Sequence, residues 1–161
     1  MRSVIINTTP LIALSNINHL ELLHKLYSKV IIPQAVFDEI RVKQNSACYH
    51  ALKSSDWIEV MSIQNVFAKE FYRTQLHNGE VEVMILSKEQ HADLVIIDDH
   101  SAKRHAKHLG LNVVGTLGVL IRSKELGYID KIEPLVEEMV EKGFYLSEAV
   151  KMLVLKSAGE Q

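Results

Sequence analysis

The run Leu94-Val95-Ile96-Ile97 constrains the fold of this chain more than any other stretch of its sequence. Four consecutive apolar residues, three of them β-branched, are typical of a short strand that is buried on both faces. Such a strand lies inside a parallel sheet, because the crossover helices of a parallel sheet cover both of its faces. The run is followed at once by Asp98, which we therefore place at the carboxyl end of a central strand.

Strands and helices alternate in the same way up to about residue 127. Short β-branched runs predict the strands, while polar caps, prolines and apolar stripes predict the helices. The expected strands are 4–6, 30–32, 57–61, 94–97 and 113–114. A first helix begins near Pro10, a leucine stripe at positions 20, 22, 23 and 26 continues it, and further helices are expected at 33–40, 46–54, 66–71, 79–90, 101–109, 116–126, 132–142 and 147–156. Gly110, Thr116 and Ser147 are expected to cap helices.

This pattern predicts one α/β domain over residues 1–161, with an α/β core at 1–127 and two C-terminal helices at 128–161. The length of 161 residues and the hydrophobic fraction of 47% suit a single core. A single cysteine, Cys48, excludes an internal disulfide and favours a reduced, cytoplasmic setting. The apolar runs are all shorter than the roughly 18 residues of a membrane span, so we expect no membrane segment.

Four polar side chains could share one site at the carboxyl edge of the predicted sheet: Asn7, Glu39, Glu80 and Asp98. Ligands of open parallel sheets bind beyond the carboxyl ends of the strands. Acidic groups that gather there repel each other, and a divalent cation is the usual way to offset that repulsion. The formal net charge of −2 argues against a chain that binds nucleic acid simply by being basic.

Each acid also has an ordinary structural interpretation. Asp98 and Asp99 both suit the start of the next helix, where unpaired amides favour carboxylates, and Asp99 is the better candidate for the cap. Glu80 and Glu82 are separated by about 200° around their helix, so both cannot face one centre. Glu39 lies inside a helix, where a solvent-facing position is as consistent with the pattern as a site position.

Five blocks, taken in order, resemble the PIN-domain ribonucleases, and in particular a prokaryotic subgroup long filed as uncharacterised PIN-like proteins. The resemblance covers almost the whole chain. The blocks are VIINTTPLIAL at 4–14, VIIPQAVFDEI at 30–40, HNGEVEVMIL at 77–86, ADLVIIDDHSAKR at 92–104 and LGLNVVGTLGVL at 109–120.

The resemblance implies a PIN-like α/β/α sandwich with a central parallel sheet, in which an acidic cluster holds Mg²⁺ or Mn²⁺ and hydrolyses RNA. The family positions fall on Asn7, Glu39, Glu80 and Asp98, with Glu80 selected over Glu82 by its spacing from Asp98. It also implies a toxin of a toxin-antitoxin pair, an antitoxin protein as partner, and a homodimer that uses residues 111–120 and the C-terminal helices.

Asn7 departs from the family pattern, which has aspartate at this position. An amide oxygen can ligate a hard cation but brings no negative charge, so we expect weaker metal binding. The alternative function is therefore a catalytically weakened module that binds RNA or a protein. Replacement of Asn7 by aspartate discriminates between the two interpretations.

The remaining polar and aromatic residues give weaker signals of function than these four site residues. The histidines at 100, 105 and 108 lack the His-Glu-x-x-His pattern of zinc sites. With Lys103, Arg104 and Lys107 they make helix 101–109 locally basic, which suits either an RNA backbone near the metal or an ordinary solvated surface. The aromatic residues, such as Tyr27, Tyr49, Trp57, Phe71 and Tyr72, are scattered and predict no base-stacking platform.

Overall fold

The computed structural model describes residues 2–43, 46–72 and 76–160, and within them five strands form one parallel sheet. The strand order is β3-β2-β1-β4-β5, and every neighbouring pair is parallel. The strands are β1 (Val4–Ile6), β2 (Val30–Pro33), β3 (Ile58–Met61), β4 (Leu94–Ile96) and β5 (Val113–Val114). These agree with the five predicted strands, within one residue at each end.

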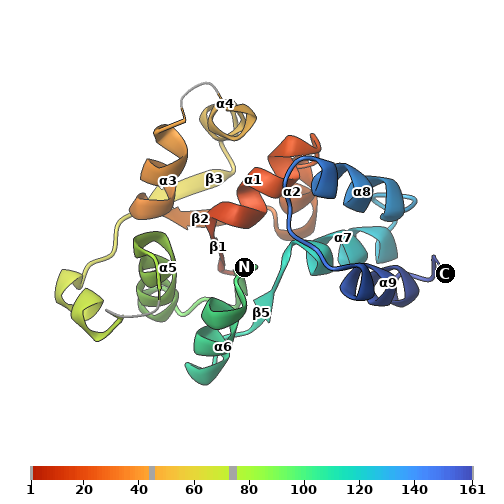
Figure 1. Ribbon diagram of the computed structural model, residues 1–161. Helices are drawn as coiled ribbons and strands as arrows, with labels where there is room; N and C mark the ends of the chain where they lie inside the picture. Colours follow the sequence, from red (N-terminus) through yellow and green to blue (C-terminus); the bar gives the residue numbers. More distant parts are fainter. Residues whose placement is uncertain (1, 44–45, 73–75, 161) are drawn as a thin grey trace.

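Helices connect the strands and cover the sheet (Figure 1). They are α1 (Thr8–Asn16), α2 (Glu21–Tyr27), α3 (Gln34–Arg41), α4 (Ala47–Ser54), the 3₁₀ helix η1 (Val66–Tyr72), α5 (Asn78–Glu89), α6 (His100–His108) and α7 (Thr116–Glu125). All three residues of β1 are at most 1% exposed. Since alternate residues of a strand point to opposite faces, both faces of the sheet are covered, which confirms the α/β/α fold class.

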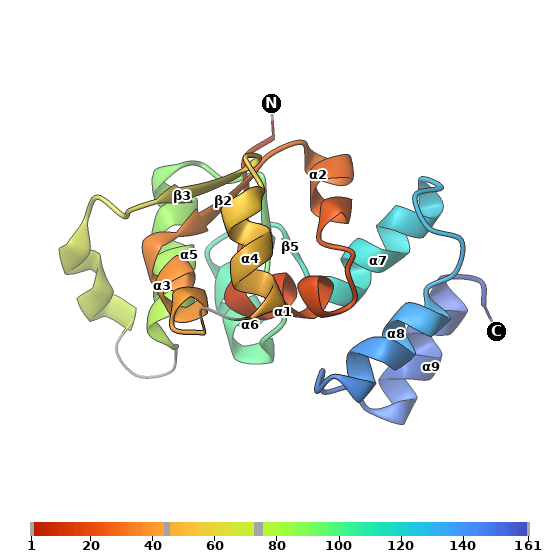
Figure 2. The same ribbon diagram turned by 90° about the horizontal axis from the view of Figure 1, so that it is seen from above.

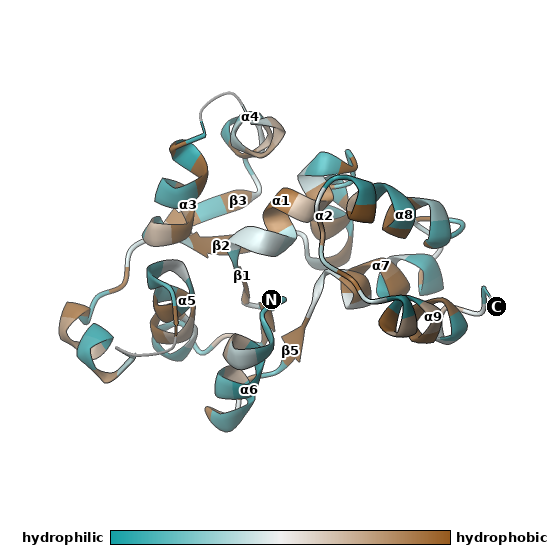
Figure 3. Cartoon of the chain, in the orientation of Figure 1, coloured by the Kyte–Doolittle hydropathy of each residue, from teal (hydrophilic) through white to brown (hydrophobic). Residues whose placement is uncertain are grey.

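The apolar run 94–97 lies at the centre of the core. Val95, Ile96 and Ile97 are fully buried, and β4 pairs with β1 on one side and β5 on the other. Figure 3 shows β2 and β5 in the brown of apolar residues, whereas α6 is mostly teal. The continuous apolar pattern of 94–97 thus correctly predicted a strand buried on both faces.

Three local predictions need correction. The leucine stripe does not continue the first helix: α1 ends at Asn16, the backbone at Asn18 has a positive φ of 57°, and α2 starts at Glu21. The segment 66–71 is a 3₁₀ helix whose residues are exposed or half-buried. Thr116 is not the cap of α7, because Gly115 occupies the N-cap and Thr116 is the first helical residue.

Two C-terminal helices, α8 (Glu133–Glu141) and α9 (Glu148–Ser157), pack beside each other next to α7 (Figure 2). Lys151 Nζ of α9 lies 3.7 Å from Glu137 Oε1 of α8. Val136, Met139 and Leu155 are buried in the same hydrophobic cluster as the sheet. The side chain of Ser147 accepts a hydrogen bond from Val150 N and caps α9, as predicted.

None of the helices in the described ranges is long and apolar enough to cross a membrane.

Candidate functional site

Asn7 and Asp98 follow two neighbouring strands at the carboxyl edge of the sheet. Ile6 of β1 is in register with Ile96 of β4, and Asn7 N donates a hydrogen bond to Ile96 O at 2.9 Å. Asn7 is only 5% exposed, and in the described structure its side chain makes no capping hydrogen bond to α1. The parallel register therefore brings Asn7 beside the end of β4, two residues before Asp98.

The carboxylate of Asp98 is held by Thr116, for which the sequence pattern predicted only a helix cap. Thr116 N donates to Asp98 Oδ1 at 2.8 Å, and Thr116 Oγ1 donates to Asp98 Oδ2 at 2.6 Å. Thr116 is fully buried at the start of α7, directly after β5. Its position after a strand end was the signal in the sequence, because it shares the sheet edge with Asp98.

Lys103 is a second residue that the structure brings to Asp98. A Cβ placed on Gly115 would lie 2.7 Å from Lys103 Nζ and 2.9 Å from Asp98 Oδ1. The ammonium and the carboxylate therefore share the space beside the Gly115 backbone. Glycine at this position keeps that space open, and the half-buried Lys103 adds a positive charge next to the acid.

Asp99 caps α6, as predicted: its Oδ2 accepts a hydrogen bond from Ala102 N at 2.9 Å. Its charge also reaches the neighbouring helix α5, since Asp99 contributes to raising the pKa of Glu80. Asp99 thus combines an ordinary structural role with a place beside the buried acid.

Glu80 and Glu82 are both buried, but their surroundings differ. Glu82 is 7% exposed, its Oε1 accepts from Ala35 N at 3.0 Å, and its Oε2 pairs with Lys69 Nζ at 2.8 Å. The charge of Glu82 is therefore compensated by a cation and by the N-terminal end of α3. These contacts assign Glu82 a structural role.

Glu80 is 6% exposed and has acids for neighbours. Burial raises the pKa of its carboxyl, and the charges of Asp99 and Glu39 raise it further, whereas a hydrogen bond from His77 N at 3.0 Å and the charge of His77 act in the opposite direction. A buried carboxyl with a raised pKa is a common feature of functional sites. Of the two buried glutamates of α5, Glu82 pairs with a lysine, whereas Glu80 accepts a hydrogen bond from the backbone N–H of His77.

Glu39 lies on α3, which packs against α5, and its side chain is exposed to solvent. Its carboxylate rests against the backbone of Gly79, so closely that a Cβ at Gly79 would overlap Glu39 Oε1. A solvent-facing Glu39 was predicted if its role is structural, and a Glu39 close to Glu80 was predicted if it belongs to the site. The structure shows both.

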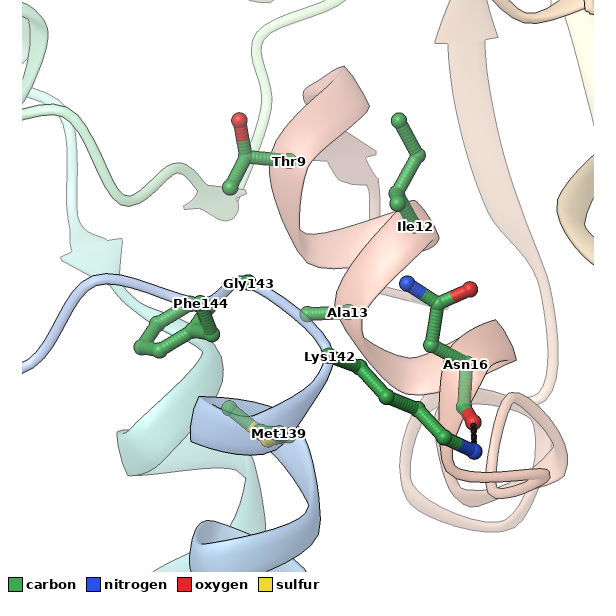
Figure 4. A pocket seen from close by; sticks show the side chains of 8 residues that line it. All are labelled: Thr9, Ile12, Ala13, Asn16, Met139, Lys142, Gly143 and Phe144. Carbon is green, nitrogen blue, oxygen red and sulfur yellow. Dashed lines mark hydrogen bonds between the residues drawn. The ribbon is translucent and has the colours of Figure 1, made fainter.

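Two hollows flank the first turn of α1, at the same edge of the sheet. One, of about 460 Å³, is lined by Thr8 and Glu39 together with residues of α1, α3 and the segment before α4. The other, of about 710 Å³, is lined by Thr9, Asp98 and Lys103 together with the segment between α8 and α9. Figure 4 draws an adjoining pocket between α1 and the C-terminal helices, in which Thr9 on the first turn of α1 lies near Gly143 and Phe144 of that segment. The start of α1 thus separates the Glu39 side of the site from the Asp98 side.

The oxygen donors at this edge have the chemistry that Mg²⁺ or Mn²⁺ prefers, namely carboxylates and an amide. Within the described ranges, no group of three or more His, Cys, Asp or Glu side chains is arranged to hold a metal ion. Mg²⁺ does not require such a group, because it commonly keeps several waters and uses one or two carboxylates. Glu80, which is buried and has a raised pKa, is one of these oxygen donors.

Comparison with known proteins gives a family and a fold. A family model described as a PIN domain matches residues 3–160. None of the curated proteins matches the chain. Among solved structures, a PilT N-terminus domain protein from the hyperthermophilic archaeon Sulfolobus solfataricus P2 is similar, with a TM-score of 0.52 and 20% sequence identity over 89% of this chain and 98% of that chain. At this identity, the structural similarity bears on the fold alone.

Proposed function

This chain belongs to the PIN domain family, and from that premise we propose that it is a metal-dependent endoribonuclease that hydrolyses phosphodiester bonds of RNA. The PIN fold is typical of nucleases, and PIN domains commonly bind nucleic acids. The proposal goes further than the family in naming RNA, the metal and the residues that act.

The observation that carries the proposal is the environment of Glu80. Burial and the neighbouring charges of Asp99 and Glu39 raise the pKa of this carboxyl, so its ionised form is destabilised in the folded chain. A divalent cation beside Glu80 would reverse that effect by supplying the missing positive charge. The family positions Asn7, Glu39, Glu80 and Asp98 are the residues that would hold Mg²⁺ or Mn²⁺.

The chain's own residues prepare the site for a phosphodiester. Thr116 fixes both oxygens of Asp98, so this acid needs no reorganisation when substrate arrives. Lys103 places a positive charge beside Asp98, where a phosphate of the substrate would be attracted. A bound divalent cation supplies a Lewis acid and lowers the pKa of a coordinated water.

The test is cleavage of a mixed RNA pool with Mg²⁺ or Mn²⁺ by the wild type and by Asp98→Asn. The wild type should cleave, and Asp98→Asn should not, although its fold is retained by circular dichroism. Asp56→Asn is the matched control, because Asp56 is exposed and precedes β3 at the opposite edge of the sheet. Full activity of Asp98→Asn would contradict the proposal.

A second function is favoured by one observation, the neutral amide at position 7. With no charge from Asn7, the chain could have kept the fold as a module that binds RNA or a protein while losing catalysis. The variant Asn7→Asp decides between the two: cleavage that appears only in this variant would support the binding module, whereas cleavage by the wild type supports the enzyme.

The family resemblance also supports a biological setting for this chain, which we propose here. It includes a cytoplasmic location, a role as toxin with an antitoxin protein as partner, and a homodimer formed through residues 111–120 and the C-terminal helices. Induced expression should arrest growth in the wild type but not in Asp98→Asn. Sedimentation of the purified chain tests the dimer.

A further inference from the structure

The groove on the Asp98 side of the site has a wall that comes from the distant end of the chain. Asp98, Asp99, His100 and Lys103 line one side, and the segment 143–147 between α8 and α9 lines the other. In Figure 1 this segment runs past α1 and the start of α7. The C-terminal helices therefore complete a groove beside the proposed catalytic acid.

Tyr145 is the most exposed large side chain of that wall. It is 92% exposed, whereas its neighbours Phe144 and Leu146 are half-buried and pack against the hydrophobic core. The two neighbours hold the segment in place, so the ring of Tyr145 is presented to solvent from a fixed backbone. A backbone held in this way needs no further ordering when a flat partner stacks on the ring.

The groove offers a cation and the room for a nucleotide. Lys103 lines it together with the acids Asp98 and Asp99, and Arg104 and Lys107 are exposed further along α6, outside the lining. Sites for single-stranded nucleic acid combine positive charge for the backbone with aromatic rings for the bases. The volume of about 710 Å³ is in the range of pockets that hold small organic ligands.

We propose that Tyr145 stacks on an unpaired base of the RNA whose phosphate lies at Lys103 and Asp98. This inference rests on the proposed function and adds a residue that determines which nucleotides are accepted. A base in a duplex is stacked on its neighbours and cannot offer its face to Tyr145, so the groove should select single-stranded RNA or loops.

The first experiment measures binding without cleavage. A short single-stranded RNA that carries 2-aminopurine is titrated with protein in EDTA, and both affinity and fluorescence quenching are recorded. Tyr145→Ala should weaken binding about tenfold or more and abolish the quenching, whereas Tyr145→Phe should retain both, because stacking needs the ring and not the hydroxyl. Binding of a duplex of the same sequence should be equal for all three proteins.

Phe67→Ala is the matched control, because Phe67 is a 79% exposed aromatic on η1, away from the groove residues. Equal affinity and equal quenching in Tyr145→Ala and the wild type would overturn the inference. So would a change in sedimentation of Tyr145→Ala with unaltered RNA binding, since Tyr145 would then contact a second copy of the chain.

Cleavage assays with Mg²⁺ or Mn²⁺ separate this inference from the proposed function. If the wild type cleaves and Tyr145→Ala does so with an unchanged KM, the role of Tyr145 is refuted and the nuclease assignment stands. If the wild type binds through Tyr145 but does not cleave, the stacking role stands and the nuclease assignment fails.

Discussion

Replacement of Gly79 by alanine should separate activity from stability at this site. Gly79 is the second residue of α5, and a Cβ there would overlap Glu39 Oε1 while making an ordinary contact of 3.5 Å with Val36 Cγ2. The overlapping atom is the end of an exposed, flexible side chain, so the Glu39 carboxylate can move into solvent. Gly79→Ala therefore displaces one proposed ligand without disturbing the core.

Stability and activity should change in opposite directions in Gly79→Ala. Glycine to alanine at a helical position compatible with alanine stabilises a protein by about 0.4–1 kcal/mol through the unfolded chain. At about 2–4 °C per kcal/mol for a chain of this size, the Tm should rise by about 1–4 °C. A displacement of about 1 Å in a positioning group can lower activity about 100-fold, so kcat/KM for RNA should fall by roughly that factor.

Thermal unfolding and RNA cleavage are measured on Gly79→Ala, Glu39→Ala and the double variant. If Gly79 acts only through Glu39, the double variant should be no less active than Glu39→Ala alone. A fall in Tm would show that Glu39 cannot move away from the added methyl group. Wild-type activity in Gly79→Ala would show that the position of Glu39 does not matter for cleavage, and either result refutes the reasoning.

Three further predictions concern the hydrogen bonds and charges of the site. Thr116→Val removes the 2.6 Å hydrogen bond to Asp98 and should lower the free energy of unfolding by about 1.5–3 kcal/mol in urea titrations. The loss should be smaller in the Asp98→Asn variant, whose acceptor is neutral. Equal losses in the wild type and in Asp98→Asn would contradict this prediction. For Glu80, the raised pKa means that the folded state binds the proton more tightly than the unfolded state. The resulting contribution to stability is complete below about pH 4.5 and is lost as the pH rises through the folded pKa. Glu80→Gln should therefore raise the Tm at pH 7 but not at about pH 4, and an identical change at both values would be inconsistent with this reasoning. Glu82→Gln, which breaks the pair with Lys69, should cost about 1 kcal/mol of stability and leave cleavage intact, so a loss of activity would reverse its structural assignment.

The fold could be predicted because its signals are local. The apolar run at 94–97 fixes a doubly buried strand by itself, and a strand of that kind requires helices on both sides. Ser147 and Asp99 cap their helices in the structure as their positions before helical stripes predicted. Such features depend on residues within one turn of each other, which a single sequence displays.

The site could be predicted only in outline, because the partners of each side chain come from distant parts of the chain. The position of Thr116 after a strand end places it at the sheet edge, but the sequence does not indicate that Thr116 holds the carboxylate of Asp98. The spacing from Asp98 favoured Glu80 over Glu82 under the family resemblance, but the sequence did not indicate that Lys69 in η1 pairs with Glu82. Tyr145 is likewise separated from Asp98 in the sequence and joins the groove only through the packing of α8 and α9.

Three glutamates of this chain show how the surroundings of an acid raise or lower its pKa. Glu82 pairs with Lys69 and accepts a hydrogen bond from the N–H of Ala35. The carboxylate of Glu160 pairs with Lys124 at 2.9 Å and accepts a hydrogen bond from the N–H of Ile132 at 2.7 Å. Burial opposes the ionisation of Glu160, but these donors hold its pKa below the usual range. Glu80 accepts one backbone N–H from His77, whose charge also lowers its pKa, but burial and the charges of Asp99 and Glu39 outweigh both and raise the pKa. A chain that keeps a buried acid with a raised pKa at the edge of its sheet loses stability at that position. A cation or substrate that binds there would restore it.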